Sequence, residues 1–246
     1  MRKAKKSDRN FFKKNGYIVF KSVFTHEECK TYIKAAHKSV KKITVQPNLY
    51  RKSNKILELI RNPKILSLAD TLLEWRMIPI GDIFFFSKSQ NKYESGSVPH
   101  QDNYGQRAEY GAYMACGVAL DDAVEENGAL RIYPGTHKLG DLRSNSKKNF
   151  VMDKKGNVIK ALPIGNNCII PKGYKEKIVE LNKGDIVFFH AHVVHYAKKN
   201  MSDTRKYRHA VYLKYIKNGY AFWPGWTEKR ELIERGDFNS RIIKTN

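Results

Sequence analysis

The stretch "GDIVFFHAHVVHYAKKN", residues 184–200, combines a signal for a fold with a signal for a site. β-Branched and aromatic residues dominate its first half and follow a Gly-Asp pair, a pattern typical of strands that begin after a turn. The second half carries three histidines, His190, His192 and His195. Imidazole is a common metal ligand, so this strand indicates a candidate metal site. The rest of the chain must supply the fold and the remaining ligands.

Runs of the same kind fill most of the chain after about residue 78. Each is short, rich in β-branched or aromatic residues, and bounded by Gly, Pro, Asn or Asp, as expected for strands. They are "IPIGDIFFFSKS" (78–89), "YMACGVALDD" (113–122), "GALRIYPG" (128–135) and "RKYRHAVYLKYIK" (205–217). Because turn residues separate many short strands and no repeat or linker interrupts them, the pattern predicts a sandwich or a small barrel.

Residues 1–77 are expected to be mostly helical and to buttress that mainly β core. Thr25 and Glu28 fit a capping box, in which each side chain accepts a hydrogen bond from the other residue's backbone N–H. Leucines recur at helical spacing in "NPKILSLADTLLEW" (62–75). Nearer the start, Ser7 is a candidate cap for a short helix that the Asn-Gly pair at 15–16 ends.

The composition is that of one globular domain, residues 1–246. The chain is 41% hydrophobic and 12% aromatic, which suffices for a sizeable core and excludes wholesale disorder. The basic start, "MRKAKKSDRN", lacks the apolar run of a signal peptide, and no apolar run approaches the ~18 residues of a membrane span. The three cysteines are scattered without zinc-site spacing, which favours reduced thiols and a cytoplasmic location.

The net charge is strongly positive, with 46 Lys and Arg against 24 Asp and Glu, formally +22. Three interpretations follow: a solvated basic surface, an anionic small substrate, or a nucleic acid bound through its phosphates. The lysines are spread along the whole chain, and no helix-turn-helix or zinc-finger pattern is present. A nucleic-acid partner is therefore not expected from the charge alone.

A second candidate pair of metal ligands lies in "SVPHQDNYGQ", residues 97–106. In an extended strand, residues i and i+2 point to the same face, so His100 and Asp102 would present an imidazole and a carboxylate side by side. Such a pair needs at least one more ligand, which any of the three downstream histidines could supply. Two histidines and one carboxylate on one face of an iron ion leave the opposite positions open, the arrangement of non-haem Fe(II) oxygenases.

Several blocks, in the same order, resemble the phytanoyl-CoA dioxygenase family of Fe(II)- and 2-oxoglutarate-dependent oxygenases. The blocks are "FFKKNGYIVFKSVFTHEEC" (11–29), "HQD" (100–102) with "VALDDAVEENGALRIYPGTHKLG" (118–140), and "KGDIVFFHAHVVH" (183–195) followed by Asn200 and Arg208-His209-Ala210. The resemblance covers most of the chain from about residue 10 onward. It implies a double-stranded β-helix, a cupin-like jelly roll over residues 78–220, with helices around it.

The resemblance also implies roles for individual residues. His100 and Asp102 match the first two iron ligands of the family. The third is His195, the last histidine of its cluster, by its place five residues before Asn200. His190 matches a family histidine that is not a ligand and is assigned to packing or hydrogen bonding, and His137 matches a family turn residue. His192 is expected to be a non-ligand as well.

In this family 2-oxoglutarate needs a cation for its far carboxylate, and the planar fork of arginine binds a carboxylate with two hydrogen bonds. Arg208 matches the family pattern Arg-x-Ala and is the expected anchor; Arg205 is the alternative. Two positions depart from the family. Tyr196-Ala197 replaces a Gly-Ser pair whose serine touches 2-oxoglutarate, and Gly117 stands where the family often has a tryptophan.

The resemblance implies a dioxygenase that uses Fe(II), 2-oxoglutarate and O2 to hydroxylate an unactivated C–H bond of a small organic substrate, releasing succinate and CO2. The identity of the substrate, which could be anionic, and the oligomeric state are left open. Residues 138–178 are expected to form a lid beside the site. Asn103, Tyr104 and Gln106 are candidates to face the substrate, and hydrogen bonding within the turn and strand is the alternative for each. The alternatives are a non-catalytic jelly-roll protein that binds a metal or ligand, and an oxygenase that modifies nucleic acid.

Overall fold

The described strands form two main antiparallel sheets and a separate two-stranded hairpin. The computed structural model describes residues 2–40, 45–89, 96–142, 149–152, 158–162, 167–204, 207–224 and 230–236. The larger sheet has the order β1 (Tyr17–Phe20), β9 (Ile186–His190), β4 (Tyr113–Ala119), β11 (Tyr207–Lys217), β3 (Met77–Ser89) and β2 (Val45–Pro47). The smaller has the order β10 (His195–Ala197), β5 (Leu130–Ile132) and β8 (Lys177–Val179).

The two sheets pack face to face around a buried apolar layer. Ala115 and Phe189 of the large sheet share one core with Leu130, Ile132 and Val179 of the small sheet. Non-consecutive strands are neighbours in both sheets, and two such sheets packed together make a double-stranded β-helix, or jelly roll. The expected double-stranded β-helix is therefore confirmed, and β1 and β2 add strands to it from the part of the chain before residue 78.

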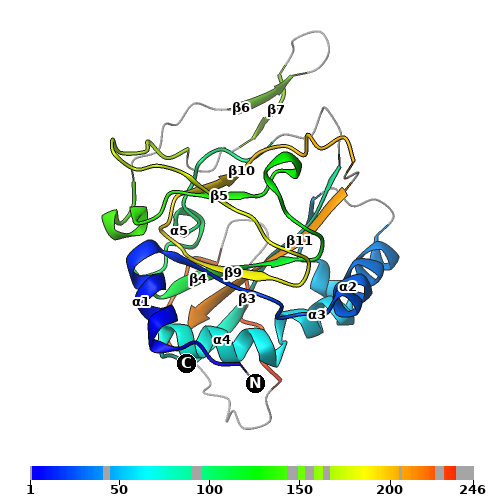
Figure 1. Ribbon diagram of the computed structural model, residues 1–246, viewed down its shortest axis with the longest axis horizontal. Coiled ribbons are helices and arrows are strands. Elements are labelled where there is room, and N and C mark those ends of the chain that lie inside the picture. The colour runs from blue at the N-terminus through cyan, green and yellow to red at the C-terminus, as the bar shows by residue number, and fades with distance from the viewer. Residues whose placement is uncertain are drawn as a thin grey trace.

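Helices cover the outer face of the large sheet. They are α1 (Lys6–Asn15), α2 (His26–Ser39), α3 (Asn54–Ile60) and α4 (Pro63–Leu73), and they lie on the opposite side of that sheet from β5 and β10 (Figure 1). Alternation along β4 explains the two layers. Met114, Cys116 and Val118 pack with the helices, whereas Ala115 and Ala119 face the other sheet. Strand β4 is thus buried on both faces.

Local signals account for the ends of these helices. The Thr25 side chain accepts from Glu28 N (3.1 Å) while Glu28 Oε2 accepts from Thr25 N (2.7 Å), so the expected capping box is present. Helix α1 ends at Gly16 in a left-handed conformation, φ 79°, as its sequence predicts. The predicted cap at Ser7 is wrong: the cap position is Lys5, whose N–H is satisfied by Asp8 (2.8 Å).

The histidine-rich stretch is not one strand. It leaves the large sheet after His190 at the end of β9, turns through residues 191–194, and enters the small sheet as β10 at His195. The last histidine is thereby carried to the other sheet, where Tyr196 pairs with Arg131 of β5.

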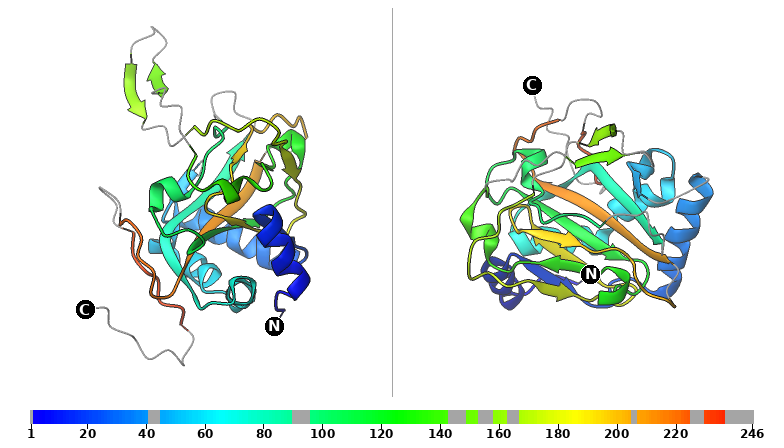
Figure 2. Two further views of the ribbon diagram at one scale, coloured as in Figure 1. Left: turned by 90° about the vertical axis from the view of Figure 1, so that its left-hand side faces the viewer. Right: turned by 90° about the horizontal axis from the view of Figure 1, so that it is seen from above.

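The segment expected to be a lid contains a separate hairpin. Strands β6 (Asn149–Met152) and β7 (Val158–Leu162) pair with each other, and Figures 1 and 2 show them standing away from the two main sheets. Leu142 and Cys168, on either side of this hairpin, are tied to the ligand-bearing loop: Leu142 N donates to Gln101 Oε1 (2.8 Å) and Cys168 N to Pro99 O (2.8 Å). Within the ranges given above, no helix is long and apolar enough to cross a bilayer.

Candidate metal centre

Three side chains from two distant parts of the sequence converge at one end of the small sheet. One potential ligand atom from each of His100, Asp102 and His195 lies within 4.8 Å of the other two. The Nε2 atoms of His100 and His195 are each 3.8 Å from Asp102 Oδ1. Among the residues that the structure describes, this is the one group of three such side chains with this geometry.

Backbone pairing brings the two histidines together. His100 N donates to His195 O and His195 N donates to His100 O, both at 3.0 Å, which forms an isolated antiparallel bridge. Asp102 does not follow in an extended strand, as the sequence suggested. Its backbone is right-handed helical (φ −65°, ψ −31°), and the short helix α5 (Asn103–Gln106) begins directly after it. A turn, and not strand alternation, presents the carboxylate to the imidazoles.

Hydrogen bonds fix the tautomer of both imidazoles. His100 Nδ1 lies 2.7 Å from Val98 O, and His195 Nδ1 lies 3.0 Å from Val193 O. A carbonyl oxygen only accepts, so each Nδ1 carries a hydrogen, and in the neutral form of each ring Nε2 is the nitrogen with the lone pair. Those lone pairs are on the nitrogens nearest Asp102 Oδ1, which is the protonation state that a metal requires.

The charge state of the group is also suited to a cation. Burial would raise the pKa of the Asp102 carboxyl, but the Lys214 ammonium and the two imidazoles outweigh burial and hold that pKa below its usual value. Burial, with repulsion from His100, lowers the pKa of His195 to about 4. At neutral pH, Asp102 is therefore ionised and His195 is neutral.

The other histidines of the sequence motifs lie in a separate cluster. The ring centroid of His190 is 5.3 Å from that of His192 and 5.1 Å from that of His137. His190 Nδ1 accepts from His192 N (3.1 Å), and His137 Nε2 donates to Lys13 O (3.1 Å). Burial and the neighbouring His137 and His192 lower the pKa of His190 to about 3. None of these three rings belongs to the group around Asp102.

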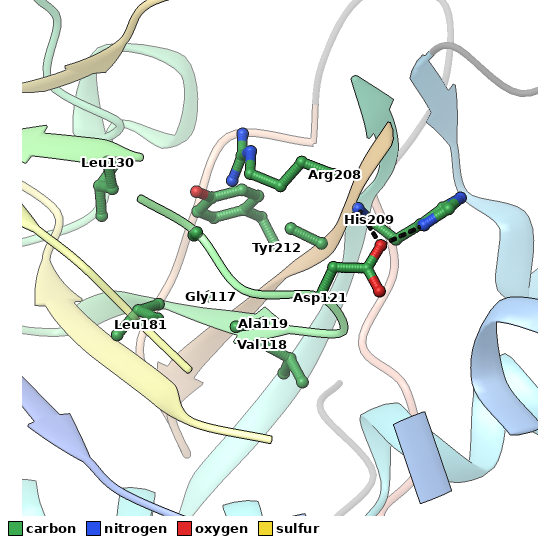
Figure 3. A pocket seen from close by; sticks show the side chains of 11 residues that line it. Gly117, Val118, Ala119, Asp121, Leu130, Leu181, Arg208, His209 and Tyr212 are labelled. Atoms are coloured by element: carbon green, nitrogen blue, oxygen red, sulfur yellow. Dashed lines mark hydrogen bonds and ion pairs between the residues drawn. The ribbon is translucent and has the colours of Figure 1, made fainter. Parts of the chain in front are cut away.

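Arg208 is a buried cation that faces the space between the sheets. It lies on β11, is 2% exposed, and its buried Nε forms no hydrogen bond within the described part of the chain. Together with Tyr212, Leu130 and Leu181 it lines a cavity, and Figure 3 shows Arg208 and Tyr212 reaching into that cavity from β11. A buried guanidinium whose Nε has no partner among the described residues fits a carboxylate ligand. The alternative anchor, Arg205, lies outside the described residues.

The residues at the two departures from the family have well-defined surroundings. At Gly117, an added Cβ would lie 3.0 Å from Tyr212 Cε1 and 3.0 Å from Val187 Cγ1, so Tyr212 occupies the room that a larger residue would take. The Tyr196 hydroxyl donates to the Glu176 carboxylate, and Ala197 N donates to Ser97 Oγ (2.9 Å).

The three residues expected near the substrate have different surroundings. Asn103 is buried, and its Nδ2 donates to Ala108 O (3.1 Å). Gln106 is buried and donates to the Asp82 carboxylate. Tyr104 is 57% exposed. Asn103 and Gln106 thus make contacts that hold the loop after Asp102, which leaves Tyr104 as the one with a free surface.

Sequence reasoning missed Lys214, whose ammonium lies 3.6 Å from Asp102 Oδ2. It is buried between charged groups: burial would lower its pKa, but Asp102 and Asp82 outweigh burial and hold the pKa above the usual value. The signal was present, because Lys214 is an even number of residues from Arg208 on the same strand and a lysine is rarely buried without a partner.

Comparisons with known proteins show the family of the chain. The sequence model of the phytanoyl-CoA dioxygenase family (PhyH) matches residues 12–210. "Phytanoyl-CoA dioxygenase domain-containing protein 1" of Danio rerio is 30% identical over 140 residues, which are 55% of this chain and 45% of that protein. The chain spans about half the length of the relatives that it matches in this way.

Solved structures share the fold. The epimerase SnoN in complex with Fe3+, alpha ketoglutarate and nogalamycin RO superimposes with a TM-score of 0.72 at 19% identity, over 88% of this chain and 84% of that one. The non-heme alpha ketoglutarate dependent carbocyclase SnoK superimposes with a TM-score of 0.71 at 20% identity, over 91% and 88%. At this level of identity the likeness establishes the jelly roll.

Proposed function

Because this chain belongs to the phytanoyl-CoA dioxygenase family of non-haem iron oxygenases, we propose that it is an Fe(II)- and 2-oxoglutarate-dependent dioxygenase that hydroxylates an unactivated C–H bond of a small organic substrate. One observation carries the proposal above all others. His100, Asp102 and His195 converge with both histidine lone pairs on the side of the carboxylate. That donor set is the one that non-haem Fe(II) oxygenases use.

The three side chains would hold the metal from one side. His100 Nε2, His195 Nε2 and Asp102 Oδ1 are the ligand atoms, and their approach from two neighbouring loops leaves the opposite side for a co-substrate and O2. When bound, Fe(II) supplies the redox chemistry that couples O2 and the decarboxylation of 2-oxoglutarate to oxidation of a C–H bond. The protein supplies orientation and a dry site, since Asp102 and His195 are both largely buried.

Arg208 would bind the far carboxylate of 2-oxoglutarate. Its guanidinium is buried between the sheets and free at Nε within the described residues. A carboxylate ligand would satisfy it with two charge-assisted hydrogen bonds. Tyr212, which lines the same cavity, would border the co-substrate where the family often has a tryptophan.

The substrate would enter beside the segment 138–178. Both ends of its hairpin region are tied to the loop that carries the ligands, through Gln101 and Pro99. A loop anchored in this way can contact a substrate that lies over the metal. We expect the exposed side chain of Tyr104, two residues after Asp102, to lie where the substrate enters. The buried free cysteines are compatible with action in the cytoplasm.

The test is release of succinate, measured with Fe(II) and 2-oxoglutarate over a panel of neutral, cationic and anionic small molecules. The proposal expects at least one compound to stimulate succinate release and to gain one oxygen atom, as seen by mass spectrometry. If a stimulating compound is cyclised or epimerised instead, the proposed hydroxylation is wrong, but the dependence on Fe(II) and 2-oxoglutarate is still supported. No stimulation by any compound, with metal bound, would favour a binding protein.

The nucleic-acid alternative is tested separately. A basic surface that binds DNA or RNA would do so with strong dependence on salt. We expect no binding of duplex or single-stranded oligonucleotides at moderate salt. Tight, salt-sensitive binding together with succinate release stimulated by the oligonucleotide would replace the small-molecule proposal.

A further inference from the structure

A buried cluster of opposite charges lies next to the carboxylate of Asp102. Asp102 Oδ1 is the oxygen near the two imidazoles, whereas Oδ2 lies 3.6 Å from Lys214 Nζ. The same ammonium lies 3.4 Å from Asp82 Oδ2. The two oxygens of one carboxylate therefore face different partners: a pair of potential metal ligands on one side and a cation on the other.

An irregularity in the sheet places Asp82 there. On β11 and β3, Tyr212 pairs with Phe84 and Lys214 pairs with Ile80, so two residues of advance along β11 correspond to four along β3. Asp82 lies in the part of β3 that carries the additional residues. Bulges next to active sites re-aim side chains, and this one directs a carboxylate at an ammonium on the neighbouring strand.

Further contacts hold the ammonium in place. Asp82 Oδ2 also accepts from Arg230 Nε (3.1 Å) and from Gln106 Nε2, so the carboxylate cannot follow Lys214 if it moves. The Lys214 side chain is 9% exposed, and its Nζ lies 5.7 Å from the centroid of the Phe84 ring. If the Lys214 side chain moved out of this enclosure, its ammonium would lose both ion-pair partners. That loss would cost more free energy than the side chain would gain in rotamer entropy.

Charge balance allows such a cation beside a metal site. Lys214 and Arg230 carry two positive charges, and Asp82 and Asp102 carry two negative charges. The cluster as a whole is neutral, so Lys214 does not add a net repulsion toward a metal cation. Lys214 then acts on Asp102 mainly by attracting the one carboxylate oxygen that it contacts, Oδ2.

We propose that Lys214 is a positioning residue that occupies Oδ2 of Asp102, so that the carboxylate binds the metal through Oδ1 alone. This inference rests on the proposed function. A free carboxylate can bind a metal with both oxygens. A second oxygen on the metal would fill a position that 2-oxoglutarate or O2 needs in a site with three protein ligands. By holding Oδ2, Lys214 keeps that position open.

The test uses Co(II), which binds the same donor types and has a visible spectrum that depends on coordination number. Wild type, Lys214→Met and Lys217→Met are loaded with Co(II), and 2-oxoglutarate is titrated by calorimetry. Lys217→Met is the matched control, because it also removes a lysine charge from β11. The Lys217 ammonium lies over the Trp75 ring, 5.5 Å from its centroid, and not at Asp102. Methionine keeps the apolar stem of the lysine in both variants.

Lys214→Met is expected to retain Co(II), to show an altered visible band, and to bind 2-oxoglutarate about 10-fold more weakly or worse, since loss of a partner that orients a metal ligand typically costs about 10- to 100-fold in metal affinity or activity. Lys217→Met should match wild type in all three. A Lys214→Met protein that equals Lys217→Met in both spectrum and 2-oxoglutarate affinity overturns the inference, and so does one that is folded but no longer binds Co(II).

A second variant keeps the test decisive if Lys214→Met does not fold. Asp82→Asn leaves Lys214 in place but weakens its anchor, and should change the Co(II) band and the 2-oxoglutarate affinity in the same direction by a smaller factor. No change in either quantity would overturn the positioning role. A wild-type protein that binds no Co(II) would remove the proposed function, and this inference with it.

Discussion

The imidazoles of His100 and His195 face each other with ring centroids 4.3 Å apart, and each is held by the carbonyl oxygen two residues before it. The same local arrangement thus occurs twice, once in the loop that holds His100 and once at the start of β10. It gives both rings the tautomer with an unprotonated Nε2. A reciprocal pair of backbone hydrogen bonds keeps the two rings together before any metal arrives. The site is preorganised, which reduces the entropy lost on binding.

Removing either ligand of the first motif should abolish metal binding. His100→Ala and Asp102→Ala each delete one of three donor atoms, so their cost in Fe(II) affinity should exceed the roughly 10- to 100-fold cost of losing a partner that only orients a ligand. Anaerobic calorimetry measures the affinity, and succinate release should fall to background. His26→Ala, at the exposed start of α2, is the control. Undiminished turnover in His100→Ala or Asp102→Ala would refute their assignment as ligands.

Arg208→Ala should raise the KM for 2-oxoglutarate and leave Fe(II) affinity unchanged. A hydrogen bond to a charged group contributes about 1.5–3 kcal/mol, so the KM should rise by roughly 10- to 150-fold. Steady-state kinetics at saturating Fe(II) measures this. Arg205→Ala is the matched variant for the alternative anchor. A larger rise in KM for Arg205→Ala than for Arg208→Ala would transfer the role to Arg205.

Gly117→Ala should destabilise the protein through Tyr212. The added Cβ meets Tyr212 Cε1 and Val187 Cγ1 at 3.0 Å, and overpacking typically costs about 1–3 kcal/mol, partly offset by the ~0.5–1 kcal/mol that alanine gains over glycine in a strand. We expect the free energy of unfolding to fall by about 1 kcal/mol in urea titrations. In a Tyr212→Ala background the same substitution should cost less. Equal costs in both backgrounds would show that Tyr212 does not fill this space.

Acid should destabilise the metal-free protein through His190. Its pKa is lowered from 6.5 to about 3, first by burial and then by His137 and His192. Below pH 6.5 the unfolded chain binds a proton that the folded chain does not, so stability is complete above that pH. It is lost as the pH falls toward 3, by about 1.4 kcal/mol per pH unit for one proton.

The variant that isolates this effect is His190→Asn, because its side-chain oxygen can replace Nδ1 as the acceptor for His192 N. Unfolding in urea at a series of pH values should give a shallower slope than in wild type. The slope should not vanish, since the pKa of His137 is also lowered, mainly by burial. Parallel profiles for the two proteins would show that His190 does not contribute.

Much of the fold follows from local patterns. The capping box at Thr25, the Asn62-Pro63 start of α4 and the glycine at the end of α1 act within a few residues, so the sequence displays them directly. The division of the histidine-rich stretch between two sheets was not visible. Every residue of β9 and the turn after it is buried, so no change in hydrophobicity marks the point where the chain leaves the large sheet.

The sequence named the residues of the candidate site better than it predicted how they are arranged. The spacing of His100 and Asp102 and the resemblance at His195 named the three residues. The prediction that His100 and Asp102 lie in one extended strand was wrong, because the chain turns at Asp102 into α5. Contacts of Asn103 and Gln106 with residues far away in the sequence hold α5 in place, and the local sequence does not show them. Lys214 was missed because its two carboxylate partners come from a bulge and a loop, which one strand's sequence does not reveal.

The central claim is that the three side chains bind Fe(II) and leave room for 2-oxoglutarate to chelate it. The most direct measurement is an anaerobic titration of the purified protein with Fe(II) and then 2-oxoglutarate, followed by visible absorption. The account predicts an iron-to-2-oxoglutarate charge-transfer band that requires both components and is absent in His195→Ala. A wild-type protein that binds both components without this band, or a His195→Ala protein that keeps it, would contradict the account.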